Sequence, residues 1–404
     1  MSERLKHRTT RSLIVKVWVL TGTVAVADFI FGATFVTLMG QRGLGAALVG
    51  GLLSLTAVTA LLIETPSGAW GDRFGHKRLV SCGLALWGAG LLVFSVASNP
   101  AVFAAAILLW SGGLALYSGA STALLVNTLN SEGLSHHGEH AIRGSETIRW
   151  ASAALGAVLV ALAGWAMADG VSIAISGGLL VTAAVWVTFT WPDSPRRSGS
   201  PIGRSMQRGV RYILSRKGRL LLALSVLAAI DLAIVILTWQ PMTVDVVGFD
   251  AGLLGIVLLV LTLSTAAGAW TTRWTRRCSP EVVVGATLSI VNASLALVLL
   301  GAVGAIVAYV LAEFLIGIAL TTLAVWAQAT FPDSIRATAT SLVGSATGVT
   351  MAITNGLMGQ LWQALGLTSA VAWSAGVLVA LLGSVGTLAA VTRSASRSAN
   401  QGTT

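Results

Sequence analysis

Long apolar runs recur along the whole chain of 404 residues, and each is long enough to cross a membrane as a helix. Only 10% of the residues are charged, whereas a soluble domain carries roughly a quarter. Most of the surface must therefore face lipid. The runs at 299–311 and 378–391 do not alternate apolar and polar residues, so helices are favoured over a transmembrane barrel.

The apolar runs predict twelve membrane-spanning helices in an all-α polytopic fold. Turn signals such as Ser98-Asn99-Pro100 and Phe331-Pro332-Asp333 separate most of them. The first run follows a basic stretch but is too long for a signal peptide, so we interpret it as a retained helix. We expect helices at 13–39, 44–69, 79–98, 101–129, 147–168, 171–191, 219–243, 252–272, 281–301, 304–329, 337–363 and 367–391.

Basic residues fall on one side of these helices. They precede the first helix, follow the second, fourth, eighth and tenth, and occupy the central connection and the tail. Only Arg42 lies in a loop on the other side. Because Lys and Arg accumulate in cytoplasmic loops, both termini are predicted to be cytoplasmic. The excess of 25 basic over 15 acidic residues then suits anionic lipid, and we expect no nucleic-acid partner.

The long connection at 192–219 divides the chain into halves of six helices. We expect an N-terminal bundle at 1–192, a cytoplasmic linker at 193–218 and a C-terminal bundle with its tail at 219–404. Apolar residues at helical spacing within 202–214, with arginines on the other face, predict a helix lying on the inner membrane surface. A solvated linker is the alternative.

The two halves share sequence at corresponding positions. Gly68-Ala69-Trp70 with Arg73 matches Gly268-Ala269-Trp270 with Arg273 after the second helix of each half. A second match, between 142–147 and 335–340, precedes the fifth helix of each half. Two related six-helix bundles around a central path are the architecture of many carriers.

The stretch from Gly68 to Arg78 carries a distinctive pattern. It places Gly68, Asp72, Arg73, Gly75, Lys77 and Arg78 in one tight connection, with His76 among them. Glycines permit close helix approach and a sharp turn, and basic residues can pair with acids or lipid headgroups. The pattern resembles the loop signature of the major facilitator superfamily, G-x-x-x-D-R-x-G-R-K-x. An ordinary positive-inside loop is the alternative.

Four further segments resemble one bacterial drug- and metabolite-efflux branch of that superfamily: 64–68, 118–120, 239–241 and 335–338. The resemblance implies two pseudo-symmetric six-helix bundles, alternating access, a bacterial inner membrane and export in exchange for protons. The sequence departs from proton antiporters because no arginine occurs between Arg78 and Arg143 and no proline between Pro100 and Pro192. An importer or uncoupled facilitator of the same fold therefore stays open.

Four acidic residues lie within apolar runs: Asp28, Glu64, Asp231 and Glu313. An ionised group at membrane depth costs several kcal/mol, so such residues usually face a cavity. Asp28 and Asp231 lie at similar depths in the first helix of each half, which suggests a paired central site for protons or substrate. The remaining candidates for that cavity are Glu313, Gln240 and Asn127, while Glu64 either braces the loop or faces the cavity. The alternative for each acid is a carboxyl that is hydrogen-bonded for packing.

No clustered catalytic constellation or phosphate-binding glycine loop is visible, so we expect neither an enzyme nor a cofactor. His136, His137 and His140 form a loop cluster that we interpret as solvated rather than metal-binding. Cys82 and Cys278 fall in or beside cytoplasmic loops, which favours free thiols. We expect a monomer in the bilayer that exports a small amphipathic molecule or drug, with protons as the candidate coupling ion. A membrane enzyme or sensor is a further alternative.

Overall fold

The computed structural model describes residues 2–131, 138–163, 170–191, 210–332 and 336–382. Some side chains near helix ends, among them 2–13 and 125–131, are outside this description. Every regular element within the described residues is a helix. The expectation of an all-α chain is therefore confirmed.

The first half begins with a long helix that is broken near its end. Its helices are α1 (Ser2–Gly32), α2 (Phe35–Gln41), α3 (Ala46–Phe74), α4 (His76–Val96), α5 (Pro100–Ser131), α6 (Gly138–Ala163) and α7 (Val171–Thr190). The first expected helix, at 13–39, thus corresponds to α1 and α2 together. A two-residue break at 33–34 separates them.

The second half follows the same order of helices. It contains α9 (Arg216–Pro241), which continues into a π-helical turn at Met242–Val246, then α10 (Leu254–Thr271), α11 (Pro280–Leu295), α12 (Ala302–Thr330), α13 (Arg336–Leu365) and a last helix at 367–382. Nine of the described helical segments are long and apolar enough to cross a membrane. Two shorter apolar helices, Thr147–Ala163 and Leu367–Leu382, and α13 bring the segments to the twelve expected.

Large apolar side chains cover the outside of the molecule. Phe189 is 82% exposed and Leu300 is 74% exposed. In water such side chains would be unfavourable, but lipid tails solvate them without cost. Inside each bundle, aromatic residues such as Phe94 and Phe103 pack edge to face, with ring centroids 4.9 Å apart. The outward apolar surface is what the low charge of the sequence requires.

The turn between α3 and α4 consists of Gly75 alone. Its φ of +93° lies in a region that residues with a Cβ rarely adopt. One residue therefore reverses the chain within the loop that resembles the superfamily signature. His76, directly after the turn, is only 6% exposed, because its ring lies against Gly71. The side chains of Glu64 and Asp72 and the surroundings of Gly68 lie outside this description.

The predicted surface helix at 202–214 falls mostly outside the described residues, as do the linker positions before 210. The described end of that segment docks on the protein. Ile213 is buried beside Leu221 and Phe331, and the Tyr212 hydroxyl donates to the Thr330 carbonyl at 2.7 Å. The end of the linker thus touches the end of α12.

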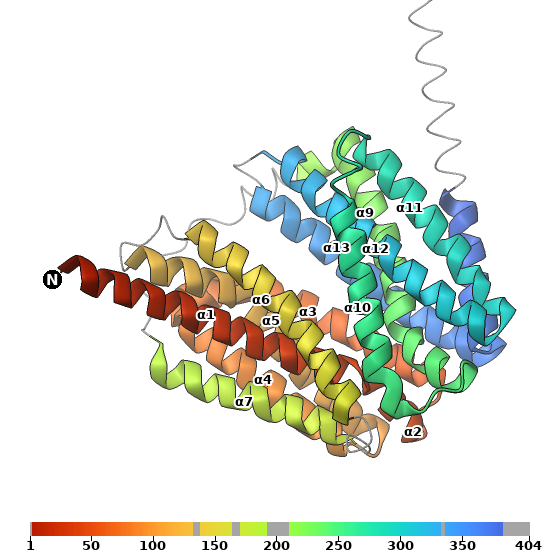
Figure 1. Cartoon of the computed structure of the whole chain (residues 1–404), viewed down its shortest axis with the longest axis horizontal. Coiled ribbons are helices and arrows are strands. Elements are labelled where there is room, and N and C mark those ends of the chain that lie inside the picture. The colour runs from red at the N-terminus through yellow and green to blue at the C-terminus, as the bar shows by residue number, and fades with distance from the viewer. Residues whose placement is uncertain (1, 132–137, 164–169, 192–209, 333–335, 383–404) are drawn as a thin grey trace, which may run out of the picture.

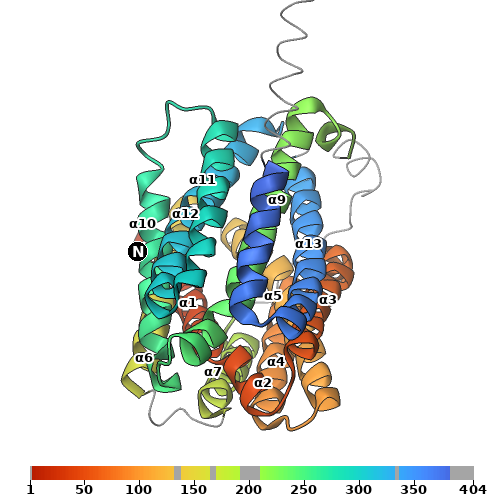
Figure 2. The ribbon, with the colours of Figure 1, turned by 90° about the vertical axis from the view of Figure 1, so that its right-hand side faces the viewer.

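The two halves lie against each other along two helix pairs, α3 with α13 and α6 with α10. Figure 1 shows the helices of the halves converging near α2 and separating toward the end that carries the N-terminus, and Figure 2 shows α3 beside α13. We call the end with Arg73, Lys77 and Arg277 the basic end and the other the distal end. This arrangement places any central cavity between the bundles.

Candidate functional site

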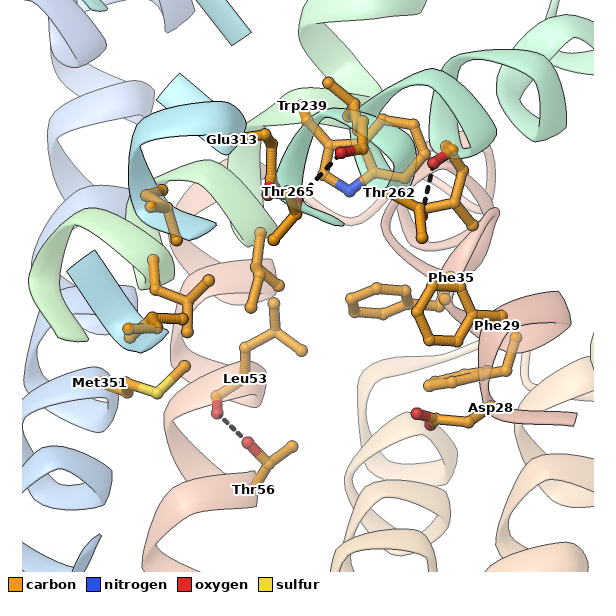
Figure 3. A pocket seen from close by; sticks show the side chains of 18 of the residues that line it. Asp28, Phe29, Phe35, Leu53, Thr56, Trp239, Thr262, Thr265, Glu313 and Met351 are labelled. Atoms are coloured by element: carbon orange, nitrogen blue, oxygen red, sulfur yellow. Dashed lines mark hydrogen bonds between the residues drawn. The ribbon is translucent and has the colours of Figure 1, made fainter. Parts of the chain in front are cut away.

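A cavity of about 540 Å³ lies between the two bundles. Helices of both halves contribute to its wall, and Figure 3 shows part of it. Its lining includes Asp28, Phe29, Phe31, Phe35, Leu53, Thr56, Trp110 and Trp150 from the first half, and Trp239, Leu261, Thr262, Thr265, Glu313, Ile316, Met351 and Asn355 from the second. A site shared by both bundles changes shape whenever the bundles tilt.

Aromatic rings form much of the wall contributed by the first half. Phe31 and Phe35 stack with centroids 5.0 Å apart, and Trp110 meets Phe31 edge-on at 4.6 Å. Trp150 on α6 adds a further ring, and Trp239 on α9 adds one from the second half. Trp110 itself lines the cavity. Such a wall suits apolar and planar ligand groups.

Glu313 brings a carboxyl to the cavity from α12. The Thr265 hydroxyl on α10 lies 2.6 Å from Glu313 Oε2 and 2.9 Å from the Leu261 carbonyl oxygen. A hydroxyl has one hydrogen, so it cannot donate fully to both oxygens. If Thr265 donates to Leu261, as a helical threonine commonly does, the short contact to Glu313 needs a proton from the carboxyl.

Asp28 brings a second carboxyl from α1. It lies across the cavity from Glu313, beside Phe29 (Figure 3). Arg149 on α6 is close enough to interact with it electrostatically. None of the described residues that line the cavity is a lysine, arginine or histidine. The cavity therefore pairs an apolar wall with two acidic groups, one from each bundle.

Asp231 lies elsewhere. It is 1% exposed and points toward α11, where Asn292 Nδ2 lies 3.0 Å from Oδ1 and 3.2 Å from Oδ2. It is not among the residues that line the cavity. The structure thus brings Asp28 together with Glu313, whereas the equal depth of Asp28 and Asp231 in the sequence suggested a pair.

Gln240 joins the two halves at the distal end. Its side chain is fully buried and enters the break between α1 and α2. Val36 N and Thr37 N each donate to Gln240 Oε1 at 3.0 Å, and Gln240 Nε2 donates to the Gly32 carbonyl at 2.9 Å. These are the backbone groups that the helix break leaves without helical partners. One side chain of α9 therefore completes a helix of the other half.

Further contacts close the distal end. The Ser54 hydroxyl of α3 donates to the Ala352 carbonyl of α13 at 2.6 Å. Gly50 lies so near α13 that an added Cβ would collide with the Asn355 carbonyl. Small residues of this kind allow close helix approach in membranes.

The cavity continues toward the basic end. A second cavity of about 280 Å³ shares Leu232, Leu320 and Met351 with the first and extends along α9, α12 and α13 to Phe331. Phe331 follows the end of α12 at the basic end. Among the described residues, the central cavity is thus continued toward the basic end, while the contacts of Gln240, Ser54 and Gly50 hold the halves together at the distal end.

The other residues predicted from the sequence are described by the structure to different extents. The side chain of Asn127 lies outside the described residues, as do those of the histidine cluster. Arg73 stacks on the Phe74 ring at 5.3 Å from its centroid, and the equivalent Arg273 lies 3.3 Å from that of Trp270. The sequence analysis missed Thr265 and Asn292. Asn292 is an amide inside an apolar run, as Asn127 is, and this feature could have identified it.

Several solved structures of transporters have the same fold. A nucleoside transporter, NupG, matches with a TM-score of 0.76 and 15% identity over 92% of this chain and 98% of that one. A bacterial homologue of the human lysosomal transporter Spinster, inward-facing and occupied, matches at 0.73 with 14% identity over 95% and 97%. A POT family transporter in complex with 5-aminolevulinic acid matches at 0.69 with 12% identity over 92% and 95%. At these identities the likeness shows the fold alone.

Among curated protein sequences, none matches this chain. The family comparison is decisive, because the Major Facilitator Superfamily matches residues 17–355, which is most of the chain. The apolar helices of the described residues, in two bundles, agree with that match. The chain belongs to the Major Facilitator Superfamily of transporters.

Proposed function

We propose that this transporter exports a small amphipathic organic cation from the cytoplasm, in exchange for protons. The observation that carries the proposal is the central cavity, with its aromatic wall, its two carboxyls and its lack of basic lining residues among those described. The protein would act as a monomer in a bacterial inner membrane. The basic end is assigned to the cytoplasm, because Lys and Arg gather there.

The cavity chemistry favours a cation over other ligands. A cation above an aromatic ring gains about 0.5–2 kcal/mol, more when water is excluded. A carboxylate that lines the cavity attracts the same charge, while an anion would be repelled by both acids. A neutral apolar molecule would gain only from burial of its surface. The acids therefore select for charge, and the rings select for an apolar or planar body.

Alternating access follows from how the cavity is enclosed. Its open end is the basic end, so the structure corresponds to a cytoplasm-facing state in this assignment. Release on the other side requires the bundles to tilt until the contacts of Gln240 and Ser54 break. The signature loop, with Gly75 as its turn and Arg73, Lys77 and Arg78 beside it, lies at the end that would then close.

Proton exchange is supported by the surroundings of Glu313. If Thr265 donates to the Leu261 carbonyl, its contact with Glu313 is satisfied when the carboxyl carries a proton. A cationic substrate and a proton would compete for this carboxyl, which is the simplest form of antiport. The second candidate is an uncoupled facilitator. It is favoured by the absence of any arginine from the α5 sequence, because antiporters of similar sequence often carry one there.

The test compares two fluorescent probes in inverted membrane vesicles, whose basic end faces the medium. Ethidium is a planar cation, and fluorescein is an anion of similar size. We expect an imposed acid-inside pH gradient to drive uptake of ethidium but not of fluorescein. Asp28→Asn and Glu313→Gln should each lower ethidium uptake by about 10-fold or more, because a contact between charged groups contributes roughly 1.5–3 kcal/mol.

Glu281→Gln is the matched control, because Glu281 lies in the first turn of α11 and outside the cavity. Uptake of fluorescein with exclusion of ethidium would contradict the proposed substrate class. Ethidium uptake that equilibrates and ignores the pH gradient would replace the antiporter with the facilitator.

A further inference from the structure

One intramembrane acid, Asp231, is not used by the central cavity. Its neighbours in the chain, Ala229 and Leu232, line the second cavity, whereas Asp231 points to the other side of α9. The thickness of α9 thus separates its carboxyl from the substrate path. A group that is 1% exposed and this far from the cavity cannot contact a substrate held there.

Asp231 has fewer hydrogen-bond donors around it than an ionised carboxylate needs. Asn292 is its only hydrogen-bonding partner among the described residues. One hydrogen of Asn292 Nδ2 goes to the Leu288 carbonyl oxygen at 2.9 Å, which leaves a single N–H for both carboxyl oxygens. Buried carboxylates need several donors or a cation to offset the loss of water.

Asn292 shows the complementary defect. It is 1% exposed, and its Oδ1 is buried without any hydrogen-bond donor. A carboxylate offers no hydrogen to this oxygen. A protonated carboxyl would donate its O–H to Oδ1 while Nδ2–H bonds the second carboxyl oxygen. A small rotation of the two side chains would give this two-bond pair, so a single proton repairs both defects.

No charged group takes the place of that proton in the described structure. The titratable side chains on the helical segments packed against α9 are Tyr309 and Glu313 on α12, Glu281 on α11 and Asp245 in the π-helical turn at Met242–Val246. The Tyr309 hydroxyl is engaged with Thr238, and Glu313 with Thr265. The only charged residue in the α13 sequence is Arg336, whose side chain lies outside the described residues.

We propose that Asp231 and Asn292 form a proton-binding site inside the C-terminal bundle, behind the cavity wall and separate from Asp28 and Glu313. That this site holds a proton is inferred from the hydrogen-bond geometry of Asp231 and Asn292 alone. Its role in coupling rests on the proposed function. A proton held there does not compete with the substrate for space, so it would act by stabilising the packing of α9 against α11 in the cytoplasm-facing state.

Infrared spectroscopy of the purified protein tests the site without any substrate. At neutral pH we expect a carbonyl stretching band of a protonated carboxyl that is lost in Asp231→Asn. The same band should stay in place in Asp28→Asn. In Asn292→Leu it should move to higher frequency, because the carboxyl loses its N–H donor. Absence of a band that depends on Asp231 would overturn the proposal.

Folding of each variant is checked by gel filtration and by the midpoint of thermal unfolding. If Asp231→Asn fails to fold, the frequency shift in Asn292→Leu decides the question, because a carboxyl that is ionised or bonded elsewhere would not respond to loss of this amide.

Transport in inverted vesicles tests the role in coupling. Asp231→Asn should bind ethidium within about twofold of the wild-type affinity and still exchange it across the membrane. It should lose accumulation driven by the pH gradient. Accumulation as in the wild type would overturn the role in coupling. If the wild type itself does not move ethidium, the proposed function fails, while the infrared result still decides whether the proton site exists.

Discussion

At the scale of single residues, the same depth in a helix does not mean the same surroundings. Asp28 and Asp231 occupy similar positions in the first helix of each half. Asp28 faces the cavity, whereas Asp231 faces Asn292 in its own bundle. The cost of a charge in lipid identified both residues, but the direction of a side chain depends on how its helix is rotated against its neighbours. That rotation is set by packing and is not visible in an apolar run.

Gly75 shows what a sequence motif can predict at this scale. A turn with glycine was expected, and its φ of +93° is the physical reason for that residue. Gly75→Ala should lower the stability of the protein by about 1–3 kcal/mol, the usual cost of such a backbone conformation for a residue with a Cβ. The measurement is the thermal unfolding midpoint of the purified variant.

Gly51→Ala is its control, because Gly51 lies in α3 with open space around its Cα. A Cβ there should leave the midpoint unchanged or raise it slightly, since alanine favours a helix over glycine. Equal thermal unfolding midpoints for Gly75→Ala and Gly51→Ala would show that a Cβ at position 75 does not strain the turn.

At the scale of helices, the break between α1 and α2 and its repair by Gln240 form one unit. The apolar run at 13–39 indicated one continuous helix, because hydrophobicity contains no information about a break of two residues. The groups freed by the break bond to a residue more than 200 positions away. The branch resemblance did include the segment with Gln240, but only the structure shows that it joins the halves.

Gln240→Leu should loosen the distal end and favour the state that opens there. Loss of the three hydrogen bonds to backbone groups, at about 0.5–1.5 kcal/mol each, corresponds to a shift of roughly 10-fold or more between states. The measurement is the labelling rate of Thr56→Cys, a cavity position, in a background without Cys82 and Cys278. A membrane-impermeant thiol reagent is applied from the distal side.

Gln41→Leu serves as the control for this helix, because Gln41 is exposed at the end of α2. We expect its labelling rate to equal that of the parent protein and the rate of Gln240→Leu to be higher. Unchanged labelling in Gln240→Leu would mean that the distal end is held by other contacts.

At the scale of the whole molecule, the number of helices and the division into halves were predictable. Both follow from the shortage of charge, the length of apolar runs and the one-sided basic loops. The location of the cavity was predictable only in outline, as a path between related bundles. Which residues meet there was not, because residues such as Thr265 and Glu313 come together only through the packing of α10 on α12.

The two native cysteines allow the movement of the bundles to be measured directly. Both are free and exposed, and they lie near the basic end of different halves. Spin labels on Cys82 and Cys278 therefore report the opening at that end. In a cysteine-free background, labels at Gln41→Cys and Asp250→Cys report the distal end.

The decisive measurement is the distance distribution of each label pair in lipid nanodiscs, across pH and with or without ethidium. We predict two populations for each pair, with the basic-end distance shortening whenever the distal-end distance lengthens. A single distance for both pairs under all conditions, or two pairs that lengthen together, would contradict alternating access around the central cavity.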